Sequence, residues 1–189
     1  SRAFLLSDPI IASQPGFKEI EQSLSNAGVE YQVHTEVSAE VPVDEVERTK
    51  EAARRYHPDL LLAVGGGSVI DTAKVVAALL THGGEPQDYY GEQLVPGPVT
   101  PVIAVPTTAG TGSEVTTIAV LSDPERALKV GISSVHLVPS AAVCDPELTR
   151  TCPPQVTAFS GMDAVCHAVE SFTSARREAT AENLVQEIF

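Results

Sequence analysis

The chain has 189 residues, of which 43% are apolar and 20% charged, and its 12 Lys and Arg residues against 25 Asp and Glu residues give a formal net charge of −13. This composition is typical of a globular protein and is too apolar for a disordered acidic chain. The negative charge argues against a nucleic-acid partner, and the absence of an 18-residue apolar run argues against a membrane span. Cys144, Cys152 and Cys166 are too few for a disulfide framework. With no export signal at the start, we expect reduced, mostly buried thiols and a cytoplasmic protein.

Strand-like and helix-like stretches alternate through most of the chain. Residues 3–7 form a short apolar strand, residues 17–24 have helical spacing, and residues 29–35 alternate as a half-buried strand does. Residues 42–56 carry many charges and a thin apolar stripe, which predicts an exposed helix. The continuous apolar runs at 60–64 and 102–105 are typical of strands covered on both faces, residues 69–80 are helical, and residues 81–101 resemble a loop. The pattern predicts an α/β fold with a parallel sheet and helices on both faces.

The alternation stops near residue 151. Cys152-Pro153-Pro154 interrupts the chain, and residues 155–172 then have a hydrophobic, helical pattern. We therefore predict an α/β domain over residues 1–151 and the beginning of an all-helical domain over residues 152–189. The sequence has a single Met, at position 162, and the helical spacing of Leu184, Val185 and Ile188 continues to its end. These features predict a fragment of a longer protein.

The first candidate site is the stretch LLLAVGGGSVIDTAK at residues 60–74. A buried strand leads into three glycines and Ser68, and a helix follows. Glycine lets the backbone approach a ligand closely, and the free N–H groups at a helix start suit a phosphate. The alternative is an ordinary strand-to-helix turn with Ser68 as its N-cap. The stretch is neither a G-x-G-x-x-G fingerprint nor a Walker A loop, and Lys74 alone is expected to be a solvated helix charge.

The second candidate site is the stretch VPTTAGTGSEVTT at residues 105–117. It again follows a buried strand and is rich in hydroxyl groups, and such a loop is costly to order unless something binds to it. Two loops of this kind would meet at the carboxyl edge of one sheet, where open α/β folds bind ligands. The alternative is a capped turn in which Thr111 or Ser113 starts a helix.

The third candidate site is a pair of side chains on the predicted helix after residue 155. Asp163 and His167 are four residues apart, so they share one face and could bind one divalent metal ion. Two ligands do not complete a metal site, and the alternative is a hydrogen bond on the helix surface.

Together the three stretches resemble the iron-containing, or group III, alcohol dehydrogenases. The resemblance spans nearly the whole chain and rests on GGGSVIDTAK at 65–74, PTTAGTGSEVT at 106–116 and GMDAVCHAVE at 161–170. It is supported by Ser7-Asp8-Pro9, by Lys129, and by CDPELT at 144–149. The resemblance implies a dinucleotide-binding α/β domain, a helical domain, and an active site between them.

The resemblance also implies roles for single residues. Asp8 would face the adenosine ribose, where a carboxylate favours NAD over NADP. Lys129 would reach the cofactor ribose, and Asp163 and His167 would be two of four ligands to Fe²⁺ or Zn²⁺, with two more histidines expected beyond Phe189. The cofactor pyrophosphate and nucleotide would be contacted by Gly66, Gly67, Ser68, Thr107, Thr108, Thr111 and Thr116. Glu40-Val41-Pro42 replaces the Asn-Pro-Thr of the family, which puts a cofactor contact there in doubt.

The expected activity is reversible hydride transfer between an alcohol and NAD, with the metal acting as a Lewis acid on the substrate oxygen. The partners would be a small alcohol or aldehyde and, in the full-length parent, further copies of the chain. The alternatives are a hydroxyacid–oxoacid transhydrogenase or a related reductase of the same fold, and a nucleotide-binding fragment that is inactive alone.

Overall fold

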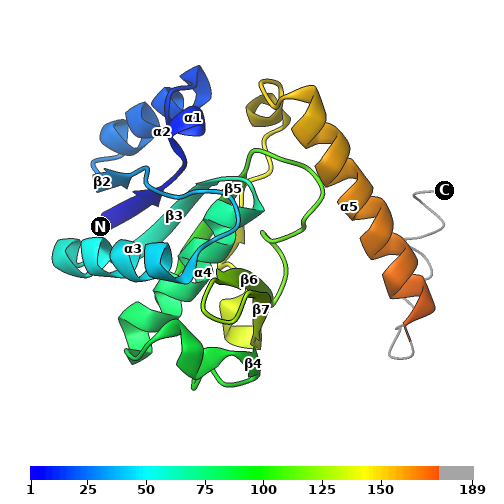
Figure 1. The fold of residues 1–189 in the computed structure, drawn as a ribbon. Coiled ribbons are helices and arrows are strands. Elements are labelled where there is room, and N and C mark those ends of the chain that lie inside the picture. The colour runs from blue at the N-terminus through cyan, green and yellow to red at the C-terminus, as the bar shows by residue number, and fades with distance from the viewer. Residues whose placement is uncertain (175–189) are drawn as a thin grey trace.

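The computed structural model describes residues 1–174, so the helical pattern predicted around Leu184, Val185 and Ile188 lies outside the described residues. Figure 1 shows a sheet covered by helices, with one long helix standing to the side. Five strands form the sheet in the order β2-β1-β3-β5-β8, and every neighbouring pair is parallel. The strands are β1 (Arg2–Leu6), β2 (Glu30–His34), β3 (Leu60–Gly65), β5 (Val102–Pro106) and β8 (Ala141–Ala142). The predicted α/β class and parallel sheet are confirmed.

Helices cover both faces of this sheet because alternate strand residues point to opposite sides. On one face Ala3 and Leu5 pack with Phe17, and on the other Phe4 and Leu6 belong to the larger core. The first face is covered by α1 (Pro9–Ala12) and α2 (Pro15–Asn26), and the second by α3 (Val43–Tyr56) and α4 (Gly67–His82).

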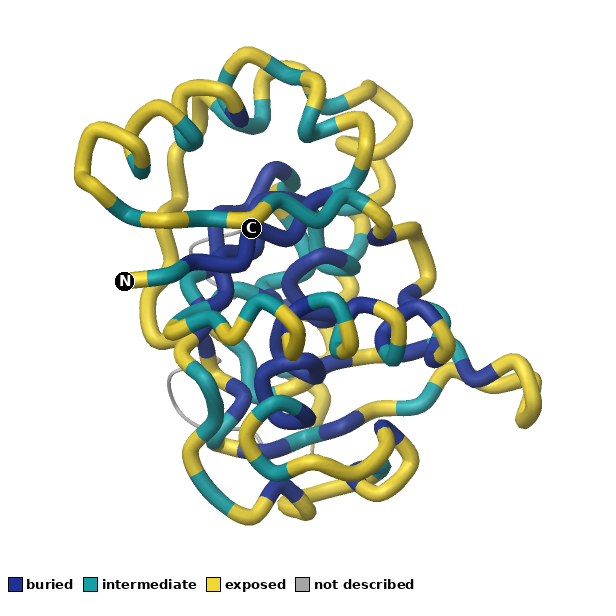
Figure 2. Tube along the Cα trace, turned by 90° about the vertical axis from the view of Figure 1, so that its left-hand side faces the viewer, coloured by how far each residue is buried: buried dark blue, intermediate teal, exposed yellow. Residues whose placement is uncertain are grey.

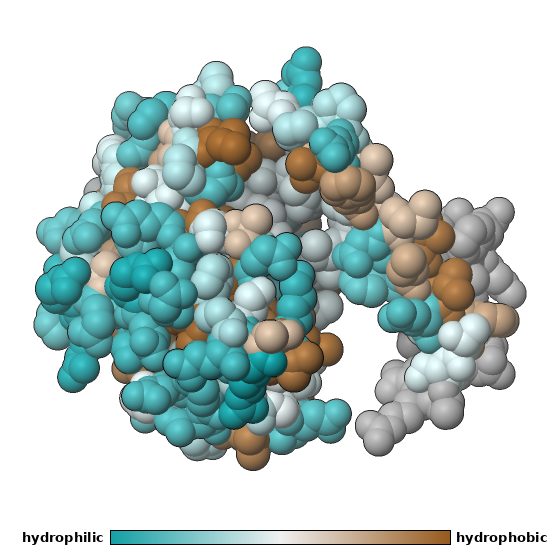
Figure 3. Space-filling view, in the orientation of Figure 1, coloured by the Kyte–Doolittle hydropathy of each residue, from teal (hydrophilic) through white to brown (hydrophobic). Residues whose placement is uncertain are grey.

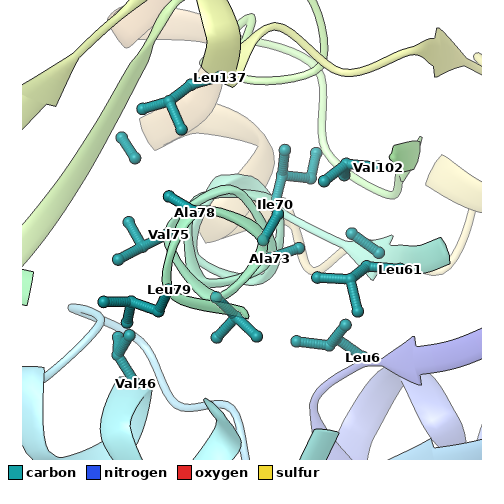
Figure 4. Packing of buried hydrophobic residues seen from close by; sticks show 14 of the residues in the cluster. Leu6, Val46, Leu61, Ile70, Ala73, Val75, Ala78, Leu79, Val102 and Leu137 are labelled. Carbon is teal, nitrogen blue, oxygen red and sulfur yellow. The ribbon is translucent and has the colours of Figure 1, made fainter. Parts of the chain in front are cut away.

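Helix α4 is the centre of the larger core. It is apolar almost all round, as a fully buried helix must be, and its residues from Val69 to Leu79 are buried. Figure 4 looks along this helix and shows it ringed by Leu6, Val46, Leu61, Val102 and Leu137. In Figure 2 the buried trace accordingly runs through the middle of the molecule. The charged helix α3 was predicted to be exposed, but its apolar stripe is buried in this core.

A small second sheet, which the sequence did not predict, packs on α4. Its strands have the order β4-β7-β6, and β6 and β7 form an antiparallel hairpin. Its buried residues Ala119, Leu121 and Ile132 join the larger core. The strands are β4 (Gly91–Glu92), β6 (Ile118–Asp123) and β7 (Leu128–Ser133), and the short 3-10 turns are η1 (Pro86–Tyr89), η2 (Val135–Leu137) and η3 (Pro146–Thr149).

The long helix α5 (Pro154–Thr173) confirms the helix predicted after residue 155. It extends away from the α/β part in Figure 1, and of its residues only Ala168 is buried. Figure 3 shows apolar side chains gathered along this helix, and Phe159 and Met162 are 65% and 62% exposed. The domain boundary between residues 151 and 152 stays a prediction.

Candidate functional site

The candidate site lies where the central strands end. β1, β3 and β5 are neighbours, and Gly65 at the end of β3 pairs with Pro106 at the end of β5. Two hydrogen bonds join the segments that follow: the buried Ser7 hydroxyl donates to the Val64 carbonyl at 2.8 Å, and the Thr107 N–H donates to the Gly65 carbonyl at 3.1 Å. The glycine and threonine loops therefore begin side by side at one edge of the sheet.

The start of α4 lacks a side-chain cap. Gly66 is the N-cap and makes no capping hydrogen bond through a side chain, so the helix start keeps unpaired backbone donors. The alternative interpretation, in which Ser68 is the N-cap, is wrong: Ser68 lies inside the first turn, and its carbonyl accepts a hydrogen bond from the Thr72 hydroxyl. Gly66, Gly67 and Ser68 are all half-buried, so these donors and the Ser68 hydroxyl are accessible to a ligand.

The glycines of this turn face the threonine loop. A Cβ on Gly66 would lie 3.3 Å from Thr108 Oγ1, and a Cβ on Gly67 would lie 2.9 Å from Thr111 Cγ2. Larger residues would thus force the two loops apart. No helix begins at Thr111 or Ser113, so the alternative interpretation of this loop as a capped helix start is wrong. The structure brings Gly66, Gly67, Ser68, Thr107, Thr108 and Thr111 together at one edge.

Asp8 lies at the same edge, directly after β1. Its Oδ1 accepts hydrogen bonds from the Ile10 and Ile11 N–H groups at 2.8 and 2.9 Å, which makes it the N-cap of α1. The residue is half-buried. Asp8 therefore has a structural role, which is independent of the ligand role implied by the family resemblance.

A cavity of about 450 Å³ opens between α1, α2, η3 and the ends of β3 and β5. Its wall is partly apolar, from Ile11, Phe17 and Leu148, and Thr107 joins it to the threonine loop. Ile11 of this wall belongs to α1, the helix that Asp8 caps.

Lys129 lies on the β6–β7 hairpin and is exposed. Its Nζ is 2.7 Å from a carboxylate oxygen of Glu40, and the Ser122 N–H donates to the Val41 carbonyl. Of the residues at the family's Asn-Pro-Thr position, Glu40 therefore contacts the lysine expected at the cofactor, and Val41 contacts the same hairpin. Within the described residues Lys129 pairs with Glu40, and the structure does not bring it to Gly66–Ser68.

Lys74 is fully buried, so the expectation of a solvated helix charge is wrong. Its Nζ donates to the Thr116 carbonyl at 2.9 Å, to Thr116 Oγ1 at 3.2 Å and to the Ile118 carbonyl at 2.8 Å. Burial lowers the pKa of Lys74 to about 8, although the charge of Asp71 opposes this shift. Thr116 thus binds the lysine of α4, in addition to the nucleotide role implied by resemblance.

Asp163 and His167 share a face of α5, as predicted. Asp163 Oδ1 lies 3.8 Å from His167 Nε2, and both side chains are about half exposed. Among residues 1–174 no group of three or more His, Cys, Asp or Glu residues is placed to hold a metal ion. The two donors suit a divalent metal chemically and form part of a site.

Helix α5 contacts the threonine loop at Gly110. A Cβ on Gly110 would overlap the backbone carbonyl oxygen of Ser160, and it would lie 2.5 Å from the carbonyl carbon. The turn of α5 that precedes Asp163 therefore packs against the loop next to Thr111.

The expectation of mostly buried thiols is wrong in the described chain, because Cys144 and Cys166 are exposed and Cys152 is half-buried.

Comparison with known proteins identifies the family. The model of iron-containing alcohol dehydrogenases matches residues 1–146. The chain belongs to the iron-containing alcohol dehydrogenase family. The sulfoacetaldehyde reductase of Bilophila wadsworthia is 39% identical over 172 residues, which are 91% of this chain and 44% of that protein. The mitochondrial hydroxyacid-oxoacid transhydrogenase of Caenorhabditis elegans is 39% identical over 92% of this chain and 38% of its own length.

Solved structures agree with this membership. The sulfoacetaldehyde reductase of Bifidobacterium kashiwanohense, solved in complex with NAD⁺, superposes with a TM-score of 0.79 at 34% identity, over 92% of this chain and 46% of that chain. The chain thus spans less than half the length of these relatives. In its described part, no helix is long and apolar enough to cross a membrane.

The sequence did not reveal a structural or functional role for Asp71 and Lys74. Both lie in the quoted GGGSVIDTAK stretch, and both are buried polar residues. The signal that was available is that a helix otherwise apolar on all sides has no solvent-facing side on which to place two charges.

Proposed function

We propose that residues 1–151 bind NAD, and that the complete protein is a metal-dependent dehydrogenase of small alcohols. The observation that carries the proposal is the uncapped start of α4 facing the threonine loop at the carboxyl edge of a parallel sheet. Helix starts at such edges bind phosphates through backbone N–H groups and the positive end of the helix dipole. This also explains how a chain with a net charge of −13 could hold an anionic cofactor.

The chain's own residues would hold the dinucleotide along this edge. The backbone of Gly66 and Gly67 and the Ser68 hydroxyl would donate to the pyrophosphate, where a Cβ would intrude. Thr107, Thr108 and Thr111 would supply further hydroxyl groups, and the cavity beside Ile11 and Leu148 would accept the adenine ring. Asp8 would accept a hydrogen bond from the adenosine ribose, and Lys129 would approach the other ribose after leaving Glu40.

Asp163 and His167 would contribute two ligands to Fe²⁺ or Zn²⁺ in the complete protein. A metal there supplies a Lewis acid for the substrate oxygen, and NAD supplies the hydride acceptor. The contact between Gly110 and Ser160 would hold this part of α5 next to the cofactor loop. A homo-oligomeric parent and a cytoplasmic location remain part of the proposal.

A second candidate activity is favoured by one relative. The transhydrogenase of Caenorhabditis elegans matches as much of this chain as the reductase of Bilophila wadsworthia does. In such an enzyme an oxoacid would replace free NAD as the final hydride acceptor. A third possibility is that residues 1–189 alone bind the nucleotide without turnover.

The proposal is tested by titrating the complete protein with NAD in a calorimeter. We expect saturable binding and roughly tenfold to a hundredfold weaker binding for Gly67→Val, because a contact misplaced by about 1 Å costs up to roughly a hundredfold. Gly97→Ala is the matched control, since its Cβ would meet only His82 Cε1, at 3.8 Å. Undetectable NAD binding by the complete wild-type protein would contradict the proposal.

Asp8 provides a test of cofactor choice. We expect Asp8→Ser to lower the preference for NAD over NADP about tenfold, because removing a unit charge about 4 Å from a 2′-phosphate changes the energy by roughly 1–4 kcal/mol. Serine still caps a helix, so stability should stay within about 0.5 kcal/mol of the wild type. The measurement is kcat/KM with each cofactor, together with urea unfolding.

Asp8→Ala separates the two roles of this residue. It removes the cap as well as the charge, so we expect the same change in cofactor preference together with a loss of about 1 kcal/mol in unfolding free energy. If both variants keep the wild-type ratio of NAD to NADP efficiency, Asp8 does not face the ribose.

A further inference from the structure

Lys74 joins the central helix to the far end of the threonine loop. All three of its hydrogen bonds go to residues 116 and 118, which are 42 and 44 positions away in sequence. The near end of the loop is fixed separately, by the hydrogen bond from the Thr107 N–H to the Gly65 carbonyl. The loop is therefore attached at both ends, at Thr107 to the end of β3 and at Thr116 to Lys74 of α4.

Asp71 makes a second connection, one turn before Lys74 on the same helix. Its Oδ2 accepts a hydrogen bond from the Val120 N–H at 2.9 Å. Burial raises the pKa of Asp71, while the Val120 hydrogen bond, the charge of Lys74 and the side chain of Ser113 oppose this rise. Asp71 Oδ1 is buried without a hydrogen-bond partner in the described chain. The carboxylate thus faces both the loop, at Ser113, and the strand that follows it.

Stability alone is a poor explanation for these two charges. Burying two charged groups carries a desolvation cost, and well-packed apolar residues of similar size are often as stabilising as buried charges. The surroundings of both residues on α4 are apolar, so such packing is available. What apolar residues could not supply is a directional attachment to the backbone at Thr116, Ile118 and Val120.

The attachment has a consequence for the proposed cofactor site. The first turn of α4 carries Gly66, Gly67 and Ser68, and the loop carries Thr108 and Thr111, which face those glycines. The relative position of the two ligand-binding segments is therefore set by Thr107 at one end of the loop and by Asp71 and Lys74 at the other. We propose that Asp71 and Lys74 are positioning residues for the dinucleotide site. This inference rests on the proposed NAD-binding function.

The test compares the effects of substitutions on NAD affinity and on stability in the complete protein. Lys74→Met keeps the length of the side chain and removes its donors, and we expect the Kd for NAD to rise roughly tenfold or more in the folded protein, as displaced binding groups imply. Val46→Ala is the matched control, because Val46 is fully buried against the same core but belongs to α3. Both variants should lower the melting temperature, Lys74→Met because it leaves the buried Asp71 carboxylate without a compensating charge, and only Lys74→Met should weaken NAD binding.

The outcomes separate this inference from the function on which it rests. No NAD binding by the wild type defeats the proposed function. The positioning role is overturned if the wild type binds NAD normally and folded Lys74→Met has the same Kd for NAD. It is also overturned if Val46→Ala raises the Kd for NAD as much as Lys74→Met does.

A second measurement covers the case in which Lys74→Met does not fold. The amide of Val120, which donates to Asp71, reports the attachment directly in hydrogen exchange of the wild type. We expect saturating NAD to slow its exchange several-fold, and an unchanged exchange rate in protein that binds NAD would overturn the inference.

Discussion

Replacing His167 by alanine is expected to remove most of the bound divalent metal from the complete protein and to lower its alcohol-oxidising kcat by at least about a thousandfold. The reason is the donor set: losing one of a few protein ligands leaves a site that binds too weakly to stay loaded, and metal-assisted activation of an oxygen contributes several kcal/mol. Metal content, measured by inductively coupled plasma mass spectrometry after gel filtration, is the primary readout, and kcat is the second.

The surface hydrogen-bond interpretation of the same pair predicts a different result. Asp163 and His167 are half exposed and 3.8 Å apart, and pairs of this kind contribute at most about 0.5 kcal/mol to a helix. The metal-free melting temperature should therefore be almost the same in His167→Ala and in the wild type. Glu170→Ala is the control, since Glu170 is an exposed acidic residue one turn further along α5. Full metal content in His167→Ala would show that the pair is only a surface contact.

The main sheet and its glycine loop were predictable because their signals are local. The apolar runs at 60–64 and 102–105 identify buried strands without reference to the rest of the chain, and they became β3 and β5. The turn after β3 is also encoded locally, in three consecutive glycines. Parallel pairing then places the ends of the strands together, so the meeting of the two loops follows from the fold class.

Other features depend on partners that are distant in sequence. Lys74 is buried because backbone carbonyls 42 and 44 residues away accept its hydrogen bonds, and nothing near it in sequence reveals them. The β6–β7 hairpin was missed because its solvent-facing positions are also apolar: Ile118 and Val120 are exposed. The usual alternation of apolar and polar residues is therefore absent from β6.

Cys166 and the apolar side chains of α5 are exposed for the same reason. The sequence of α5 is hydrophobic, but among residues 1–174 this helix meets the α/β part mainly near its first turns. The exposure of a side chain depends on which other segments cover the helix as well as on the helix's own sequence. The contact between Ser160 and Gly110 joins the helix that carries Asp163 to the threonine loop and depends on the absence of a side chain at position 110.

Gly110→Ala is accordingly expected to have a large effect. Its Cβ would overlap the Ser160 carbonyl oxygen, and because that oxygen is backbone and the position of a Cβ is fixed by its own backbone, no side-chain rotation relieves the clash. Either the threonine loop or α5 must move, at a cost of about 1–3 kcal/mol or more, as for other overpacked sites. Because the loop positions Thr111 and α5 positions Asp163, we expect the Kd for NAD to rise and kcat to fall, each by about tenfold to a hundredfold. Calorimetric titration and steady-state kinetics measure the two effects.

Gly161→Ala is the matched control for this prediction. Gly161 follows Ser160 directly on α5, but a Cβ there meets nothing within 4 Å. Alanine also favours a helix over glycine by about 1 kcal/mol, so this variant should be as stable as the wild type or more stable. A loss in Gly110→Ala that Gly161→Ala does not share locates the effect in the contact between the loop and the helix. If Gly110→Ala binds NAD and turns over substrate as the wild type does, the two segments do not pack against each other in the working protein, and the cofactor loop is positioned without α5.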